Sequence, residues 1–514
     1  MRLRPILFSV SFALLLACAA PVRAQDDRLH VVVLHTNDVH GQVLPRKATW
    51  LKRDPVPMVG GLPRVAAYVN RVKEEAARDG SILFVVDAGD WYQGTPEGIL
   101  DVGQGLVRAL GHVGYDAMCI GNHEFDHGIP NLVSILESTR VPAVAANLHD
   151  ASTGKPVPWV PPWRIVERGG LKVAFVGLVT PVTPEITHPD ARTLEFVAPE
   201  IALGRAQEEL RGKVDWIVPL THMGVEEDKA LARAHPGLAL IVGGHSHTFL
   251  RDGVREGSTL IVQAGAKASA VGRADLWLDK ATKQVVESKD RLIDLDEEPE
   301  ALHVNAAVEK ACADLVARSE ARMKEVVGQM AAPAARGRDP LASSAMGNLV
   351  CDALRAHGVA EVGIMNRGGI RADLQEGPVT RRDVFEVMPF DNNLVVVKLT
   401  GAELTELVRK AVEGKAHSGI EVSGIVIEAR IDAEGERKLS RLLVDGASID
   451  LKRVFRVAMS SFMADGGDAY IERVPPGERR TDDTALVRDV LEEMFVHKSP
   501  VTAATDERYV VLKP

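Results

Sequence analysis

The sequence predicts an α/β protein with more than one domain. The chain has 514 residues, and an ordinary domain takes about 150. Hydrophobic residues make up 46% of the chain and charged residues 26%, which is typical of a globular protein and not of a disordered one. In the amino-terminal part, short apolar runs alternate with helix-like stretches, and this order is typical of buried strands in a layered α/β domain.

Five continuous apolar runs mark the strands expected between residues 29 and 292. Helix-like stretches lie between them, for example at residues 63–78 and 199–211. Such short, unbroken runs indicate strands that are buried on both faces. The runs are Val31–Leu34, Ile82–Val86, Val173–Val176, Trp216–Val218 and Leu238–Val242.

The first 24 residues predict a signal peptide. Two arginines precede an apolar run over residues 5–17, which is shorter than the ~20 residues of a membrane-spanning helix. Cleavage after this segment would give an exported protein, periplasmic or extracellular. The alternative is a lipid anchor on Cys18, which follows a lipobox-like sequence. No later stretch predicts a transmembrane helix.

The composition changes at residue 297. Residues 297–324 are rich in Ala, Glu, Val and Lys and predict one long helix, and a Pro-, Gly- and Arg-rich segment follows at residues 331–340. We therefore expect a first domain over residues 28–296, a linking helix over 297–324, and a second domain of mixed strands and helices over 325–514.

Charge and cysteine content argue against two classes of protein. The 61 basic and 71 acidic residues give a net charge of −10, which argues against a nucleic acid polymer as partner. Without the signal peptide, three widely spaced cysteines remain: Cys119, Cys312 and Cys351. An odd number at this spacing argues against a disulfide framework.

Metal-type side chains follow the predicted strands, next to glycine, where open α/β sheets gather their active sites. Three or four donors hold one ion, so a set of seven suits two ions that share a central carboxylate such as Asp90. Nitrogen and oxygen donors without thiolate favour Zn, Mn, Fe or Co over Mg or Ca. Two such ions can polarise a phosphoryl oxygen and activate water. The seven donors are Asp38, His40, Asp90, Asn122, His222, His245 and His247.

Each of these side chains, taken alone, is more often structural than functional. Their repetition after five predicted strands of one domain favours a shared site. These strands are Val31–Leu34, Ile82–Val86, Ala117–Ile120, Trp216–Val218 and Leu238–Val242. Histidines without this setting are expected to be structural or on the surface: His30, His35, His112, His127, His149 and His188.

The motifs Asp38-x-His40, Gly89-Asp90, Gly121-Asn122-His123-Glu124 and Gly244-His245-Ser246-His247 resemble those of the calcineurin-like metallophosphoesterases. The longer segments 35–41, 90–95 and 121–126 resemble more specifically the secreted 5′-nucleotidase family, which includes UDP-sugar hydrolases and 2′,3′-cyclic phosphodiesterases. The resemblance covers nearly the whole mature chain. It implies an αββα metallophosphoesterase domain followed by a mixed α/β substrate-binding domain.

The resemblance also divides the donors between two divalent ions, Zn, Mn or Co, with Asp90 as the bridge. His123 would stabilise charge at the scissile phosphate without binding metal, and Asp126 would orient it. An imidazole beside a carboxylate can be kept partly cationic. The first ion would take Asp38, His40, Asp90 and His247, and the second Asp90, Asn122, His222 and His245.

The second domain carries the substrate-binding motifs. Asn366, Arg367 and Arg371 belong to a segment whose two guanidinium groups suit a phosphate. In residues 460–470, which resemble the base-binding segment of the family, Phe462 would stack on the base and Asp468 would bind the ribose hydroxyls. Stacking is worth ~1–3 kcal/mol per base.

Two features depart from the family pattern. Residues 417–424, where the family usually carries a second aromatic residue against the base, contain none. The third arginine of the family has no clear match, and Arg409 is the nearest candidate. The sequence therefore leaves the identity of the organic part of the substrate undecided.

We expect an exported hydrolase of phosphoric ester bonds that cleaves 5′-nucleotides to nucleoside and phosphate with metal-activated water. The alternatives are UDP-sugars, 2′,3′-cyclic nucleotides or a non-nucleotide such as a sulfur-carrier conjugate. A non-catalytic nucleotide-binding protein is a third hypothesis, against which the full donor set argues. Because the two halves of the site lie in different domains, we expect closure about the linking helix.

Overall fold

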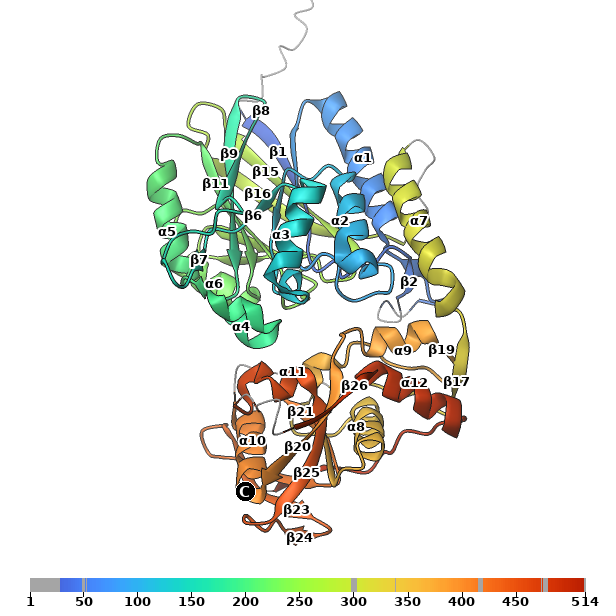
Figure 1. Cartoon of the computed structure of the whole chain (residues 1–514). Helices are drawn as coiled ribbons and strands as arrows, with labels where there is room; N and C mark the ends of the chain where they lie inside the picture. Colours follow the sequence, from blue (N-terminus) through green and yellow to red (C-terminus); the bar gives the residue numbers. More distant parts are fainter. Residues whose placement is uncertain are drawn as a thin grey trace, which may run out of the picture.

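The computed structural model describes residues 28–48, 51, 53–296, 303–337, 339–414, 419–472, 474 and 479–512. The expected signal peptide and Cys18 lie outside these residues and stay predictions. Within these ranges, no helix combines the length and the apolar character that crossing a membrane requires. The described residues form two α/β bodies, which are joined on one side by a long helix (Figure 1).

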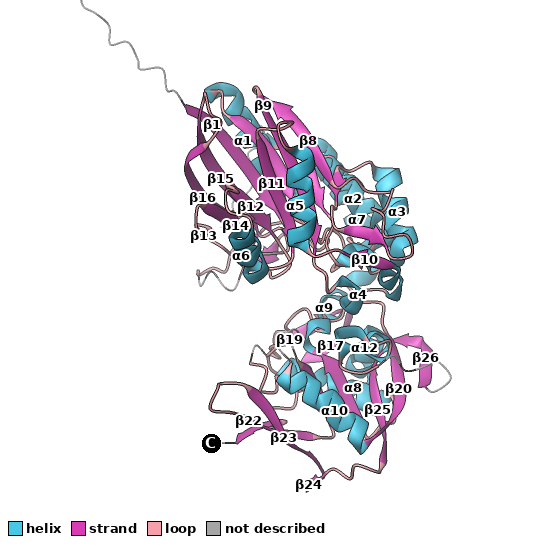
Figure 2. Ribbon diagram, turned by 90° about the vertical axis from the view of Figure 1, so that its left-hand side faces the viewer, coloured by secondary structure: helices cyan, strands magenta, loops and turns pink. Residues whose placement is uncertain are grey.

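Two six-stranded sheets face each other in the amino-terminal body (Figure 2). Apolar side chains of both sheets, among them Phe84 and Phe175, fill the space between them. The first sheet has the order β16 (Val285–Asp294), β15 (Ala270–Asp279), β1 (Arg28–Thr36), β4 (Ile82–Asp87), β5 (Ala117–Cys119) and β6 (Ala143–Val144). The second has the order β13 (Val254–Glu256), β14 (Thr259–Val262), β12 (Leu240–Gly243), β11 (Trp216–His222), β9 (Leu171–Val179) and β8 (Trp163–Arg168).

Helices cover the outer face of each sheet, which completes the predicted αββα order. In α1, apolar residues at positions 62, 65, 66, 69, 72 and 76 are buried, the spacing of one helix face turned toward a core. The first sheet is covered by α1 (Leu62–Asp79), α2 (Gln104–Gly111), α3 (Gly128–Thr139) and α7 (Ala306–Met323). The second is covered by α5 (Pro199–Leu210) and α6 (Val225–Ala234).

The carboxyl-terminal body is built around a five-stranded sheet with helices on both faces. Its order is β21 (Ile420–Ser423), β18 (Val362–Asn366), β25 (Val454–Ser460), β20 (Asn393–Thr400) and β26 (Arg479–Leu486). One face packs against α8 (Ala345–His357), α9 (Arg381–Val387) and α12 (Val487–Lys498), the other against α10 (Gly401–Glu413). A four-stranded sheet adds β24 (Ala447–Ser448), β23 (Arg437–Val444), β22 (Val426–Ile431) and β27 (Tyr509–Leu512).

The long helix α7 begins later than the sequence pattern suggests. Residues 297–302 lie outside the described residues, and the helix starts at Ala306. The side chain of Asn305 accepts a hydrogen bond of 3.2 Å from the backbone N–H of Val308 and so caps the helix. Among the described residues, Cys119, Cys312 and Cys351 are buried and free.

A buried carboxylate fastens α7 to the carboxyl-terminal body. Glu97, which is 1% exposed, lies in a loop of the amino-terminal body. Its Oε2 accepts a hydrogen bond of 2.7 Å from Nη1 of Arg382 in α9, and Ser319 of α7 donates to its Oε1. One carboxylate therefore links a loop, the connecting helix and the second body.

We predict that Arg382→Gln destabilises the protein by about 2–4 kcal/mol, because it leaves the Glu97 carboxylate buried without its cation. Calorimetric unfolding measures the effect. Arg318→Gln is the control, since it removes an exposed ion pair between α7 and Asp101 and should leave the free energy of unfolding nearly unchanged. Equal effects of the two substitutions would contradict the structural weight given to Glu97.

Candidate metal centre and substrate cavity

The metal-type side chains lie just past the carboxyl ends of strands from both sheets. The strands β1, β4 and β5 of the first sheet and β12 of the second each lead into a loop that carries them, and His222 is the last residue of β11. Five of the seven residues have a left-handed backbone, which side chains other than glycine rarely adopt and which occurs preferentially at functional sites. They are Asp38 (φ 51°), His40 (φ 48°), Asp90 (φ 60°), His245 (φ 76°) and His247 (φ 53°).

A first group brings together Asp38, His40, Asp90 and His247, with one nitrogen or oxygen atom of each within 4.8 Å of the others. Nε2 of His40 lies 2.9 Å from Nε2 of His247, which in turn lies 3.2 Å from Oδ1 of Asp38. Two ring nitrogens at this distance cannot both carry a proton without repulsion. The arrangement suits a shared cation.

A second group brings together Asp90, His222 and His245. Nε2 of His222 lies 3.1 Å from Oδ2 of Asp90. Asn122 joins this group through His245, whose Nδ1 lies 2.9 Å from the Asn122 Oδ1. Asp90 belongs to both groups, which is the central position that the donor count predicts for it.

The surroundings of these side chains fit metal ligation. Nδ1 of His40 is 2.8 Å from the carbonyl oxygen of Gln93, and Nδ1 of His222 is 2.7 Å from that of Ala88. These bonds orient each ring and leave Nε2 for a ligand, as in metal sites. Oδ1 of Asp38 and Nε2 of His222 are buried, and their contacts with His247 (3.2 Å) and Asp90 (3.1 Å) lack the geometry of a hydrogen bond. A cation would satisfy both atoms.

Burial and neighbouring charges shift the pKa values in opposite directions. Burial would raise the pKa of Asp90, but His222 and His123 hold it well below its ordinary value. Burial would lower the pKa of His222, yet Asp90 raises it to about 10. Burial and the charge of His222 lower the pKa of His245 to about 4. Asp90 is thus held ionised and His245 neutral, the protonation states that metal ligands need, whereas Asp90 keeps His222 protonated, and this proton would have to leave before His222 could bind a cation.

His123 lies at the edge of the two groups. Its Nδ1 is 2.7 Å from Oδ2 of Asp126, whose Oδ1 accepts a hydrogen bond of 2.8 Å from Thr187. Its Nε2 lies 3.9 Å from Oδ2 of Asp90. Burial would lower the pKa of His123, but Asp126 and Asp90 raise it.

Glu124, which belongs to the same sequence motif as Asn122 and His123, holds the loops together. Its carboxylate accepts hydrogen bonds from the backbone N–H groups of Asp90 (3.0 Å), Trp91 (2.7 Å) and Gly121 (2.7 Å). It therefore fixes the loop of Asp90 to the loop of Asn122. Its place in the motif, two residues after the donor Asn122, was the signal available in the sequence.

A cavity of about 540 Å³, here called the substrate cavity, is lined by both bodies. Nδ2 of Asn366 donates to Oδ2 of Asp468 at 2.9 Å, which orients that carboxylate. The amino-terminal body contributes Asn122, His123, Asp126 and His245 to the lining, and the carboxyl-terminal body contributes Asn366, Arg371, Phe462 and Asp468. Predicted site residues from distant parts of the sequence therefore share one space.

Arg367 differs from its neighbours in the motif. Its guanidinium donates to the backbone carbonyls of Ile420, Ala342 and Asp339 and lies 3.3 Å from the carboxylate of Glu421. It does not line the substrate cavity, so its part in substrate binding stays a prediction. Arg409 is exposed on α10, where it pairs with Glu406 and Glu413, away from the cavity lining.

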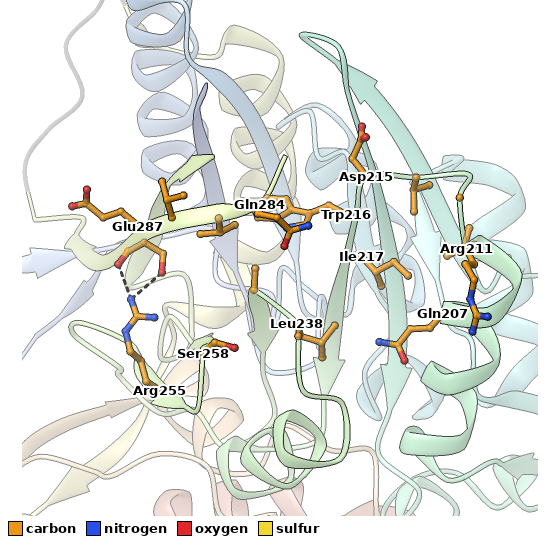
Figure 3. Close-up of a pocket in the computed structure, with 18 residues that line it drawn as sticks. Gln207, Arg211, Asp215, Trp216, Ile217, Leu238, Arg255, Ser258, Gln284 and Glu287 are labelled. Atoms are coloured by element: carbon orange, nitrogen blue, oxygen red, sulfur yellow. Dashed lines mark hydrogen bonds between the residues drawn. The ribbon is translucent and has the colours of Figure 1, made fainter. Parts of the chain in front are cut away.

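Two further cavities lie outside the substrate cavity. One of about 550 Å³, here called the arginine cavity, is lined by Arg336, Arg367, Arg371 and Arg437 together with two acidic residues. Arg371 borders both it and the substrate cavity. Figure 3 shows the other, of about 710 Å³, near the amino ends of β11 and β12 and thus at the opposite end of the strands from the metal-type side chains. No predicted site residue lines it.

Several residues that line the substrate cavity lie outside the sequence motifs. His127 and His188, expected to be structural or on the surface, both line the substrate cavity. Arg192, next to α4 (Thr183–Ile186), also lines it and donates from Nη2 to the carbonyl oxygen of Asp465 at 3.0 Å, which joins the two bodies. Phe390 lines it from the loop before β20. None of these four lies in a recognised motif.

We predict that Asp90→Asn weakens metal binding at least about tenfold, because Asp90 belongs to both groups and even the loss of a residue that only orients a metal ligand commonly costs 10- to 100-fold. Elemental analysis after loading with Zn, Mn or Co and desalting measures retained metal. Asp126→Asn is the control, since this carboxylate lines the cavity but lies in neither group. Unchanged metal content in Asp90→Asn would contradict the shared position of Asp90.

Comparison with known proteins agrees with this geometry. The calcineurin-like phosphoesterase family matches residues 31–249, and the 5′-nucleotidase C-terminal domain matches residues 326–473. A 5′-nucleotidase of Vibrio cholerae is 26% identical over 545 residues, covering 95% of this chain and 96% of that protein. Endonuclease YhcR of Bacillus subtilis is 28% identical over 467 residues, which cover 86% of this chain but 37% of that protein.

A solved structure shares the whole architecture. The crystal structure of a 5′-nucleotidase precursor from Thermus thermophilus has a TM-score of 0.83 and 28% identity, over 95% of this chain and 100% of that one. Both family matches, in the same order along the chain, agree with the two bodies described above. The chain therefore belongs to the 5′-nucleotidase family of phosphoester hydrolases, with a calcineurin-like phosphoesterase domain followed by a 5′-nucleotidase C-terminal domain.

Proposed function

We propose that this chain is an exported 5′-nucleotidase that holds two divalent ions and cleaves 5′-nucleotides to nucleoside and phosphate. One observation carries the proposal: the substrate cavity is lined at once by Asn122 and His123, beside the metal-type groups, and by Phe462 and Asp468. A phosphate and a nucleoside have suitable partners in the same space. The predicted export signal and the Cys18 alternative belong to the proposal, as do the domain limits at residues 296 and 325.

The donor sets suggest how the ions would be held. The two ions, Zn, Mn or Co, would polarise the phosphoryl group and activate water when bound. Asp90 would belong to both ions, in keeping with its place in both groups. The remaining ligands would be Asp38, His40 and His247 for one ion, and Asn122, His222 and His245 for the other.

The chain itself would stabilise the transferred group. Asp126 holds Nδ1 of His123, so the proton at Nε2 can neutralise charge on the phosphoryl group or on the leaving oxygen. Arg371 lines the cavity. Burial lowers the pKa of its guanidinium, and the negative charge of Asp90 opposes this shift. The Arg371 guanidinium would add a second positive charge at the phosphate.

The nucleoside would lie against the carboxyl-terminal body. Phe462 would stack on the base, and Asp468, oriented by Asn366, would accept hydrogen bonds from the ribose hydroxyls. The part of the 417–424 segment that the structure describes supplies no second aromatic face. Val182 and Ile186 add apolar lining from the amino-terminal body.

UDP-sugars are a second candidate substrate class. The arginine cavity borders the substrate cavity at Arg371 and carries four arginines against two acidic residues. This excess positive charge suits the second phosphate of a nucleoside diphosphate derivative.

A substrate panel tests the proposal on metal-free protein that is reloaded with Zn, Mn or Co. We expect kcat/KM for AMP to exceed that for a simple aryl phosphate by about 5- to 100-fold, the effect of one stacked base. UDP-glucose and 2′,3′-cyclic AMP complete the panel. A preference for UDP-glucose would replace the first candidate by the second, and a preference for the aryl phosphate would contradict both.

We predict that Phe462→Ala raises KM for AMP by about 5- to 100-fold, because the base loses its aromatic partner. The aryl phosphate, which has no base, should keep its kinetic constants within about twofold. Phe462→Tyr retains the ring and is the control for AMP. If both substrates suffer equally, Phe462 serves the fold and not the base.

A further inference from the structure

Phe390 lies between the two bodies, in the loop that joins α9 to β20. Its ring stacks on the imidazole of His123, with 5.5 Å between the ring centroids and 18° between the planes. The guanidinium carbon of Arg371 lies 5.9 Å from the same ring centroid. The phenyl ring therefore contacts two groups that the proposed mechanism places at the phosphate.

The loop of Phe390 is fixed from both sides of the boundary. Nε2 of Gln93, in the amino-terminal body, donates to the carbonyl oxygen of Pro389 at 3.2 Å. Arg488 of α12 donates to the carbonyl oxygens of Pro389 and Phe390 at 3.4 Å and also pairs with Asp391. The ring thus has a defined place relative to both bodies.

The His123 ring has neighbours that together define its orientation. Asp126 holds Nδ1, and the edge of the His40 ring packs against it at 5.3 Å with an angle of 67°. Phe390 adds a stacked contact from the other body. A hydrogen bond to one nitrogen leaves rotation about that bond open, and a flat aromatic neighbour restricts it.

We propose that Phe390 is a positioning residue, which holds the His123 imidazole and the Arg371 guanidinium in the orientation that the transferred phosphoryl group requires. The proposal rests on the proposed function, in which His123 stabilises charge at the phosphate. Phe390 itself takes no part in proton transfer or metal ligation. Since the stack crosses the boundary, His123 is fully oriented only when the two bodies have the arrangement described here.

Phe390→Leu tests this in the metal-loaded enzyme, with an aryl phosphate as substrate so that the result does not depend on the base site. We expect kcat to fall about 10- to 100-fold, the scale of a misplaced catalytic group, while KM stays within about threefold and metal content is unchanged. Phe390→Tyr, which keeps the ring, should retain kcat within about threefold.

A double-mutant cycle separates positioning from a structural role. In a His123→Ala background, Phe390→Leu should lower kcat by no more than about threefold, because the imidazole is absent and only the longer contact of the ring with Arg371, at 5.9 Å, is left to lose. Trp277→Leu is the matched control: Trp277 stacks on His30 at 5.0 Å and lies 5.3 Å from Nζ of Lys289, far from the cavity lining. It should leave kcat within about twofold.

Several results would overturn the proposal. These are an equal fall in kcat with and without His123, a rise in KM with unchanged kcat, or a Phe390→Tyr variant that is as slow as Phe390→Leu. Thermal midpoints show whether each variant is folded, and Phe390→Met replaces Phe390→Leu if the latter is unstable. Full kcat in His123→Ala alone would instead remove the proposed role of His123, and the failure would then lie in the proposed function.

Discussion

The site depends on one buried carboxylate that faces imidazoles on several sides. Asp90 is 1% exposed, and its Oδ2 lies within 4 Å of ring nitrogens of His222, His40 and His123. A buried anion is costly unless cations or hydrogen bonds surround it. The loops must therefore pack closely, and a Cβ on Gly121 would lie only 2.3 Å from Oδ1 of Asp90. The left-handed backbone of Asp90 is the local cost of this packing.

The sequence predicted the layered α/β body and the grouping of its metal-type side chains for a simple reason. The donors follow strands directly, and the carboxyl ends of parallel strands meet at one edge of a sheet. To place Asp38, Asp90 and His222 in one site, it was thus enough to assign the strands before them correctly. The sequence also predicted that Asn366 and Asp468 belong to one site, because both residues lie in recognised motifs. The 2.9 Å hydrogen bond between them was not predictable.

What the sequence could not provide were contacts set by the placement of one body on the other. Phe390, Arg192 and the Glu97–Arg382 pair each join residues more than 200 positions apart, and no local pattern marks them. Arg367 shows the same limit in another form. Its motif suggests a phosphate ligand, but its guanidinium lies against distant backbone carbonyls, a result of tertiary packing that spacing does not encode.

The shared lining of the substrate cavity divides the chemistry of the protein into two parts that can change separately. In the proposed function, the loops after the strands of the first body would set which bond is broken, whereas the segments around Phe462 and Asp468, which line the same cavity, would face the remainder of the substrate. During evolution, new leaving groups could be accommodated by drift in the second body alone. The contacts across the boundary, such as Arg192 to Asp465, would then be the elements that have to co-vary.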